Sequence, residues 1–419
     1  MASVFARPNM LLVELPTEIL SVIFSYIPDS GCLVQIMQVC RLFRDMIEPI
    51  LYRSMHLQLP LTSTSRDSRG GTYNLGHLAG LIDALSARPQ HSRLVKILYL
   101  QLDDPKGLDC SYKIKISNLF PHLQELSLSP PSPHLDLTGM LFLKYLRLNF
   151  GDMADYPQPV QLILHHFWIP TLRILQIEYL ELESQWVDLD PLQRHQTSPI
   201  IDLRIHALTD VDQSIGILTS LLNSVKSLKR FTLDAELDAV ISHMVHDWLS
   251  LDAILCALRF HADTLEDIFI AASDGSSIRR TTPTWSIMLF SSLRKLAIPI
   301  SCLEYCKGSN CDFALPPKLE ELQLQQQECY EEISVWYSCY EGLKALAKRK
   351  RDGFPELRLI VWWTQMSIAW FESSKRLPIP PIGTLIRTFE EVDVLFSWIT
   401  HPVFKGSPFG QAFRPPSGE

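Results

Sequence analysis

The chain has 419 residues, 47% hydrophobic and 20% charged, which is typical of a globular protein and excludes a largely disordered one. The formal net charge of −8 argues against nucleic acid or an anionic membrane as the main partner. The apolar run before Glu14 is too short for a signal peptide, and no stretch approaches the ~20 apolar residues of a membrane span. Nine cysteines then indicate free thiols in a reducing compartment, so we expect a cytoplasmic and/or nuclear protein.

Residues 11–54 predict three short helices. Pro16 suits the first turn of a helix, and Pro28 to Gly31 supply a turn before the second one. The apolar residues of the first helix recur at three- and four-residue steps: Ile19, Leu20, Ile23, Phe24 and Ile27. A module of about forty residues buries little surface alone. Its surplus of apolar side chains therefore indicates a partner surface.

Four blocks in this stretch resemble an F-box in their order and spacing. They are Leu15-Pro16-x-Glu18-Ile19-Leu20, Ile23-Phe24-Ser25-Tyr26, Val39-Cys40-Arg41-x-Phe43-Arg44 and Leu51-Tyr52-Arg53. With the repeats described below, the chain resembles a fungal-type F-box protein with degenerate leucine-rich repeats. One departure is Phe43, where many members have Trp, and we expect weaker packing there. The alternative is an ordinary three-helix cap on the following domain.

The resemblance implies a Skp-type adaptor as partner, and through it a cullin–RING ubiquitin ligase. The adaptor-binding residues that it implies are Leu15, Pro16, Ile19, Leu20, Ile23, Phe24, Val39, Cys40 and Phe43.

A pattern of the form apolar-x-x-apolar-x-apolar recurs through the rest of the chain. Its ten copies start at Val95, Leu123, Leu143, Leu172, Ile200, Leu228, Leu265, Leu293, Leu319 and Phe354. The starts differ by 28, 20, 29, 28, 28, 37, 28, 26 and 35 residues, so six of nine gaps lie between 26 and 29. That period is typical of leucine-rich repeats, each with a strand and a helical or irregular return. The alternative is a conventional α/β domain with the same triplets as strands.

We therefore expect an α/β fold in which a three-helix F-box precedes a leucine-rich-repeat-like solenoid of about ten strand–helix repeats. The expected domains are 11–54 F-box, 55–74 linker, 75–363 solenoid, 364–400 C-terminal capping segment and 401–419 flexible tail. Long helices are predicted at 75–87, 239–260 and 333–350, and one closing amphipathic helix at 384–400. The basic run Lys348 to Arg351 is either an import signal or, more plausibly, a solvated helix end.

No catalytic motif was found, and we expect no enzyme activity, no cofactor and no metal. Cys302, Cys306 and Cys311 fit no standard zinc spacing, and His243 and His246 are better explained as packed or surface residues. Target binding is expected at polar triplet positions of the inner, concave face. These are Lys96, Glu125, Lys144, Arg173, Arg204, Arg230, Lys295 and Glu321. Their mixed signs, with basic residues ahead, only mildly favour an acidic or phosphorylated ligand.

These expectations together predict the substrate-recognition subunit of an SCF-type ubiquitin ligase. The F-box docks the Skp-type adaptor, and the solenoid holds an unknown target protein. The alternative is a leucine-rich scaffold that docks the same adaptor without delivering its partner for ubiquitination.

Overall fold

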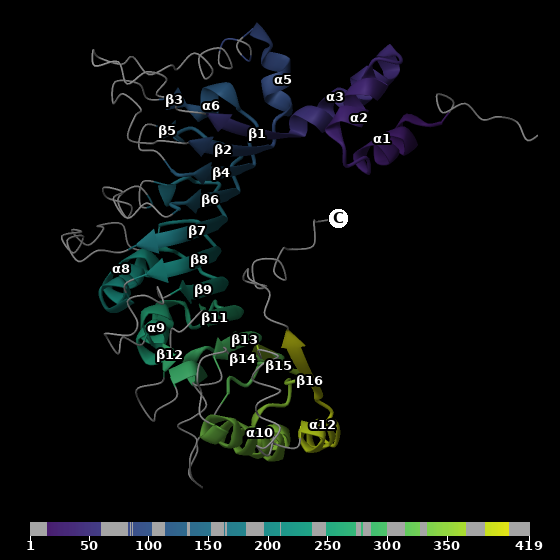
Figure 1. Cartoon of the computed structure of the whole chain (residues 1–419). Coiled ribbons are helices and arrows are strands. Elements are labelled where there is room, and N and C mark those ends of the chain that lie inside the picture. The colour runs from purple at the N-terminus through teal and green to yellow at the C-terminus, as the bar shows by residue number, and fades with distance from the viewer. Residues whose placement is uncertain are drawn as a thin grey trace, which may run out of the picture. The chain divides into compact units, whose positions relative to one another are not determined.

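The computed structural model comprises two compact units, Met1–Leu146 and Arg147–Glu419. Figure 1 labels their helices and strands. The residues that the structure describes are 15–59, 83, 85, 87–102, 114–131, 135–151, 163, 166–181, 197–209, 211–236, 249–273, 278–279, 286–299, 315–326, 333–365 and 382–401.

The first unit begins with three helices, α1 (Thr17–Ser25), α2 (Ser30–Met37) and α3 (Arg41–Arg53). Pro16 precedes α1, and its carbonyl accepts the N–H of Leu20, as expected for proline at a helix start. The Asp29 carboxylate caps α2 by accepting the N–H of Gly31 at 2.9 Å. The chain therefore leaves the helical conformation only at residues 27–29, and Ser30 and Gly31, which were expected in the turn, belong to α2.

The core of these helices is small and aromatic. Its buried residues are Leu20, Phe24, Leu33, Phe43 and Ile47. The rings of Phe24 and Phe43 meet edge to face, with their centroids 5.2 Å apart. Phe43 is 4% exposed, so it fills the core as the aromatic anchor of this position.

Helix α3 continues directly into strand β1 (Ser54–Leu59), which lies in the stretch where a linker was expected. Strand β1 pairs in parallel with β2 (Ile97–Leu102), and β2 pairs with β4 (Glu125–Ser129). The unit also contains α5 (Pro89–Leu94), α6 (Ile116–Leu119) and a small parallel pair, β3 (Ile114–Lys115) with β5 (Leu135–Asp136). The predicted helix at 75–87 lies mostly outside the described residues.

Side-chain contacts join α3 to α5. The imidazole of His91 stacks on the Tyr52 ring, with centroids 4.6 Å apart, and its Nε2 lies 3.2 Å from the Glu48 carboxylate. On the strand that follows α3, His56 stacks on Tyr99 of β2 at 4.1 Å. Helix α3 is therefore tied both to α5 and to the first strands of the same unit.

The second unit consists mainly of parallel strands in chain order. These strands are β7 (Ile174–Glu181), β8 (Asp202–Thr209), β9 (Arg230–Glu236), β11 (Asp267–Ser273), β13 (Lys295–Pro299), β14 (Glu321–Gln326), β15 (Leu359–Gln365) and β16 (Leu395–His401). Strand β6 (Tyr145–Asn149) contains the boundary between the units. With β1, β2, β4 and β6, the described strands of this parallel arrangement number twelve.

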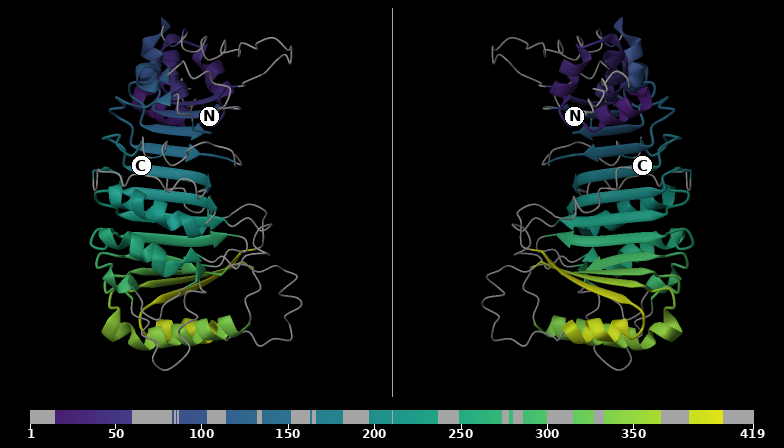
Figure 2. Two further views of the ribbon diagram at one scale, coloured as in Figure 1. Left: turned by 90° about the vertical axis from the view of Figure 1, so that its left-hand side faces the viewer. Right: turned by 90° about the vertical axis from the view of Figure 1, so that its right-hand side faces the viewer.

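Helices return the chain between these strands. They are α8 (Val211–Ser224), α9 (Leu251–Leu258) with the 3-10 turn η4 (Arg259–His261), the 3-10 turn η5 (Ser286–Leu289), α10 (Ile333–Gly353) and α12 (Ile382–Glu390). The remaining elements are the short paired strands β10 (Leu249–Ser250) and β12 (Ile278–Arg279). Helices α8 and α9 lie along the same side of the strands, and α10 and α12 lie side by side (Figure 1, Figure 2).

The strands alternate as the sequence predicts. In β8, Leu203 and Ile205 are buried in the core, while Arg204 and His206 lie on the opposite, polar face. Nine of the ten expected strands begin two residues after the first apolar residue of their triplet. The tenth, β15, begins at Leu359, three residues later than Phe354 predicts, because Leu357 takes the first buried position.

The C-terminal part differs from the prediction of one closing helix at 384–400. Helix α12 ends at Glu390, and β16 then adds a strand beside β15. Asp393 has a left-handed φ of 57°. The N–H groups of Asp393 and Val394 bond to the carbonyls of Glu390 and Phe389, which is the Schellman pattern that ends a helix.

One buried histidine connects three segments of the second unit. His261 is 2% exposed, its Nε2 lies 2.9 Å from the Leu222 carbonyl, and its Nδ1 lies 3.5 Å from the Leu228 N–H. Burial lowers the pKa of His261, against the opposing effect of the Leu222 carbonyl. The neutral imidazole is therefore the form that fits this position.

Candidate functional sites: a helical docking face and a polar strand face

Helix α1 is apolar on two faces. Leu20 and Phe24 point into the core and are at most 1% exposed. Ile19, Val22 and Ile23 lie on the other face and are 38–54% exposed, and Tyr26 after the helix is 81% exposed. Because these four residues are spaced by three and four, they form one stripe on the surface of a small domain. Such an exposed apolar stripe is typical of a protein-binding surface.

The same module exposes three further apolar residues: Val34 on α2, Val39 in the turn after α2 and Leu42 on α3, each at least 39% exposed. We call the seven residues Ile19, Val22, Ile23, Tyr26, Val34, Val39 and Leu42 the docking face. Of the predicted adaptor-binding residues, Ile19, Ile23 and Val39 lie on it, and Pro16 is exposed at the start of α1. Leu15 and Cys40 are partly buried against the core.

Three predicted adaptor-binding residues have their side chains in the core instead. Leu20, Phe24 and Phe43 are 0–4% exposed, because a three-helix module needs its largest apolar side chains for its own interior. The structure corrects their assignment as direct contacts: they hold the helices that carry the docking face. Sequence reasoning missed Val22, Tyr26, Val34 and Leu42. The signal for Val22 and Tyr26 was their own four-residue spacing along α1, offset by two residues from the buried Leu20 and Phe24.

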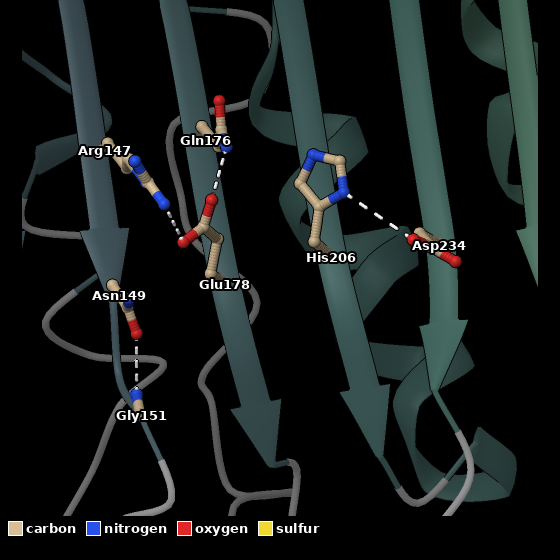
Figure 3. A network of polar contacts seen from close by, with 7 residues as sticks. All are labelled: Arg147, Asn149, Gly151, Gln176, Glu178, His206 and Asp234. Carbon is tan, nitrogen blue, oxygen red and sulfur yellow. Dashed lines mark hydrogen bonds and ion pairs between the residues drawn. The ribbon is translucent and has the colours of Figure 1, made fainter. Parts of the chain in front are cut away.

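The second candidate site is the polar face of β6 to β9 in the second unit (Figure 3). Arg147 Nη2 donates to Glu178 Oε2 at 2.6 Å, and Gln176 Nε2 donates to Glu178 Oε1 at 2.5 Å. Both oxygens of Glu178 are therefore engaged, and this carboxylate is 11% exposed while Arg147 is 37% exposed. Asn149 accepts the N–H of Gly151, which has a φ of 61°, at the end of β6. The Asn149 bond shapes the turn that follows the strand.

A second buried carboxylate lies on the same face. Asp202 is 1% exposed and accepts two bonds from Arg204, from Nε at 3.1 Å and from Nη2 at 2.8 Å. Arg230 on β9 places its Nε 3.3 Å from the same carboxylate. Nearby, His206 Nδ1 lies 3.9 Å from Asp234, which is 15% exposed (Figure 3). Each of these carboxylates is more buried than its nitrogen partner.

The backbone is strained beside Glu178. Tyr179 has a φ of 55°, the only positive φ of a non-glycine residue within a described strand. In the register of β7 with β8, Glu178 lies opposite His206 and Leu180 opposite Leu208, on either side of Tyr179. A left-handed residue inside a strand costs on the order of 1 kcal/mol, and such strain clusters at functional sites. The distortion therefore singles out this part of the polar face.

Further along the second unit, charge alternates from strand to strand. Each of four neighbouring strands begins with the second residue of a doublet of like charges. The doublets are Lys229-Arg230 (β9), Glu266-Asp267 (β11), Arg294-Lys295 (β13) and Glu320-Glu321 (β14). Ion pairs join Lys229 to Glu266 at 2.7 Å, Arg294 to Glu320 at 3.6 Å and Lys295 to Glu321 at 3.4 Å. Burial raises the pKa of Asp267, while Lys295 and Arg230 act in the opposite direction. The doublets neutralise one another across strands.

The predicted target-binding residues occupy three different rows. Glu125, Arg230, Lys295 and Glu321 are the first residues of their strands, and Arg204 is the third residue of β8. Lys96, Lys144 and Arg173 lie one residue before their strands begin. Within the second unit, Arg204, Arg230, Lys295 and Glu321 are held in ion pairs, and Arg173 donates to the Pro199 carbonyl at 3.1 Å. The three rows correspond to the second, third and fifth positions of the triplet, which the prediction had grouped together as one concave face.

The described residues contain no group of three or more His, Cys, Asp or Glu placed to hold a metal ion. Cys302, Cys306, Cys311, His243 and His246 lie outside those residues. Lys348 and Arg349 are exposed near the C-terminal end of α10, where cations are favoured. Of the helices described, none is long and apolar enough to cross a membrane.

Comparison with known proteins bears on the helical module. The family described as F-box-like matches residues 12–58, which include α1, α2, α3 and most of β1. No curated protein matches the chain. The leucine-rich-repeat assignment and the fungal type stay predictions. The chain therefore carries an F-box-like domain, which supports its resemblance to F-box proteins.

Proposed function

We propose that this protein is the target-recognition subunit of an SCF-type ubiquitin ligase. The F-box-like domain binds a Skp-type adaptor, as F-box domains generally do, and the strand unit binds a target protein. The observation that carries the proposal is the docking face, an apolar surface stripe on a domain whose core is already complete.

In this proposal the chain supplies proximity and no catalytic group. A conjugating enzyme attached to the ligase meets lysines of the held target at a high effective concentration, so the reaction gains rate without a catalytic group from this chain. The adaptor links the chain to a cullin–RING ligase, and the complex works in the cytoplasm or nucleus. The direct connection of α3 to β1 supports this role, because it transmits the position of the helical domain to the first strands without a flexible linker.

Adaptor capture tests the proposal. The variant Ile19→Lys with Ile23→Lys places charge in the middle of the docking face, and both positions are exposed, so the fold tolerates it. We expect the wild-type chain to co-purify with a Skp-type adaptor at one-to-one stoichiometry and the variant to lose it. The matched control is Leu395→Lys, an exposed apolar position of the second unit.

A folded double variant that still captures the adaptor stoichiometrically would contradict the docking assignment. Delivery of a target is a separate question from docking. It is tested by measuring whether proteins bound to the strand unit gain half-life when the chain is removed, since a scaffold that does not deliver its partner leaves that half-life unchanged.

A further inference from the structure

Three arginines of the second unit each pair with a carboxylate that is more buried than the arginine itself. Arg147 hydrogen-bonds to Glu178 and Arg204 to Asp202, and Arg230 forms an ion pair with Asp202 (Arg147 and Glu178 are drawn in Figure 3). The arginine side chains are 37%, 19% and 47% exposed, whereas Glu178 and Asp202 are 11% and 1% exposed. A ligand that approaches this face therefore meets guanidinium N–H groups before it meets carboxylate oxygens.

We propose that Arg147, Arg204 and Arg230, the arginine face, bind carboxylate side chains of an acidic, extended segment of a partner protein. A guanidinium group has five N–H donors in a planar fork, so one arginine can bond to more than one acceptor group. Pairing with Glu178 and Asp202 orients the guanidinium groups before the ligand binds, which reduces the conformational entropy lost on binding. The inference rests on the proposed function, since it states the chemistry of the target segment.

Charge balance selects a carboxylate ligand over a phosphate. The arginine face carries three positive charges, and four carboxylates adjoin it: Glu178, Asp202, Asp234 and, opposite Arg230 on β11, Asp267. The face therefore has no excess of positive charge. A phosphate brings close to two negative charges against these fixed carboxylates, whereas a glutamate or aspartate brings one. The site therefore offers directed donors without the excess positive charge that a dianion requires.

The strand spacing sets the spacing of the acidic residues. Arg147 lies on β6 and Arg230 on β9, three strand positions apart in the order β6-β7-β8-β9. Three steps of ~4.8 Å give about 14 Å across the strands. Arg147 is the third residue of β6 and Arg230 the first of β9, which adds about 7 Å along the strands, so the separation is about 16 Å, or four to five residues of an extended chain. The segment thus has two acidic residues about four to five positions apart, and Arg204 on β8 lies between their partners.

The strained backbone lies at the same place. Tyr179, 44% exposed and left-handed, directly follows Glu178. A strained residue persists only where the surrounding structure holds it, and such residues cluster where ligands bind. This observation is independent of the charges and points to the same part of the face.

The experiment measures binding of a fluorescein-labelled glycine–serine peptide with two glutamates about four to five residues apart to the full-length chain, without adaptor. Matched peptides carry glutamine or phosphoserine at the same two positions. The variant is Arg147→Gln with Arg230→Gln, in which Glu178 keeps Gln176 and Asp202 keeps Arg204 as partners. The control is Lys318→Gln with Arg387→Gln, which removes the same charge from other exposed positions of that unit.

We expect the glutamate peptide to bind, the glutamine peptide to bind at least about tenfold more weakly, and the arginine variant to lose about tenfold in affinity while the control keeps it. The proposal is overturned by no detectable binding of the glutamate peptide, by equal binding of the glutamine peptide, or by equal losses in both variants. Tighter binding of the phosphoserine peptide overturns the choice of a carboxylate. Adaptor capture by the arginine variant is measured separately, so failure of the docking assignment is distinguished from failure of this one.

Discussion

The carboxylate of Asp202 on β8 is almost fully buried and lies 3.3 Å from Nε of Arg230 on the neighbouring strand β9. Arg204 on its own strand binds the same carboxylate through two nitrogens. A buried carboxylate keeps its charge only when it is paired and hydrogen-bonded. Asp202 is therefore the central acceptor of the polar face, and its loss affects the strands on both sides of the ion pair.

We predict that Asp202→Ala lowers the free energy of unfolding by about 1–3 kcal/mol. The cost stays below that of a fully buried pair because both arginines retain contact with water. Urea unfolding followed by circular dichroism measures it. The matched control is Glu266→Ala, whose ion pair with Lys229 is more than 40% exposed on both sides and contributes less than about 1 kcal/mol. Equal losses in the two variants would show that burial of Asp202 does not matter.

The alternating doublets predict a charge-reversal experiment. Lys295→Glu places a third carboxylate between Asp267 and Glu321, its register partners on the two neighbouring strands. We expect a loss of about 1 kcal/mol that shrinks at high salt, because directly opposed like charges repel and exposed charges are screened. Adding Glu321→Lys restores one opposite pair and recovers part of the loss. No recovery in the double variant would mean that this row contributes nothing through charge.

A pH dependence follows from His261. Its pKa is lower in the folded chain than in the unfolded chain because the folded state buries it. The stabilisation is complete above the ordinary histidine pKa of about 6.5 and is lost as the pH falls through the lower folded value. We therefore predict that the free energy of unfolding decreases below about pH 6.5 in the wild type.

The variant His261→Asn isolates this effect. Asparagine keeps one acceptor and one donor group and does not titrate, so the variant is less stable at neutral pH and its stability falls less between about pH 6.5 and the folded pKa. The measurement is urea unfolding at a series of pH values. Parallel pH profiles for wild type and variant would exclude His261 as the titrating group.

Much of the strand architecture follows from local sequence. In β8, Leu203 and Ile205 alternate with Arg204 and His206. A shift of one residue in the strand register would turn the apolar side chains outward and the polar ones inward, so burial fixes the register. The triplets therefore located strands, and β15 was displaced only because Phe354 and Leu357 are both apolar and both buried. The charged doublets can be read from the sequence. Which of them form ion pairs depends on which strands are neighbours, and this is a property of the fold.

Helix α12 shows where the sequence misleads. Leu385, Phe389 and Phe396 follow helical spacing closely enough to predict one helix, and all three are buried. The chain instead turns at Asp393, and β16 pairs in parallel with β15 from Leu395 to His401. Spacing finds the buried residues here, but it does not distinguish two ways of burying them.

The two faces of α1 give the last prediction. Leu20→Ala removes a fully buried side chain and lowers the free energy of unfolding by ~2–5 kcal/mol. Val22→Ala with Tyr26→Ala removes exposed side chains and changes that free energy by less than about 0.5 kcal/mol per site. On the docking assignment, the exposed pair nevertheless weakens adaptor binding by about tenfold or more, since aromatic and apolar anchors at an interface cost on the order of 1–2 kcal/mol when truncated.

Calorimetric titration of the adaptor into each folded variant, with thermal melts as the stability measurement, separates the two effects. The core variant loses stability first and binds normally as long as it is folded. The surface variant keeps its melting temperature and loses affinity. An exposed pair that can be truncated without any loss of affinity would place the adaptor on another surface of the domain, while leaving the assignment of Leu20 and Phe24 to the core intact.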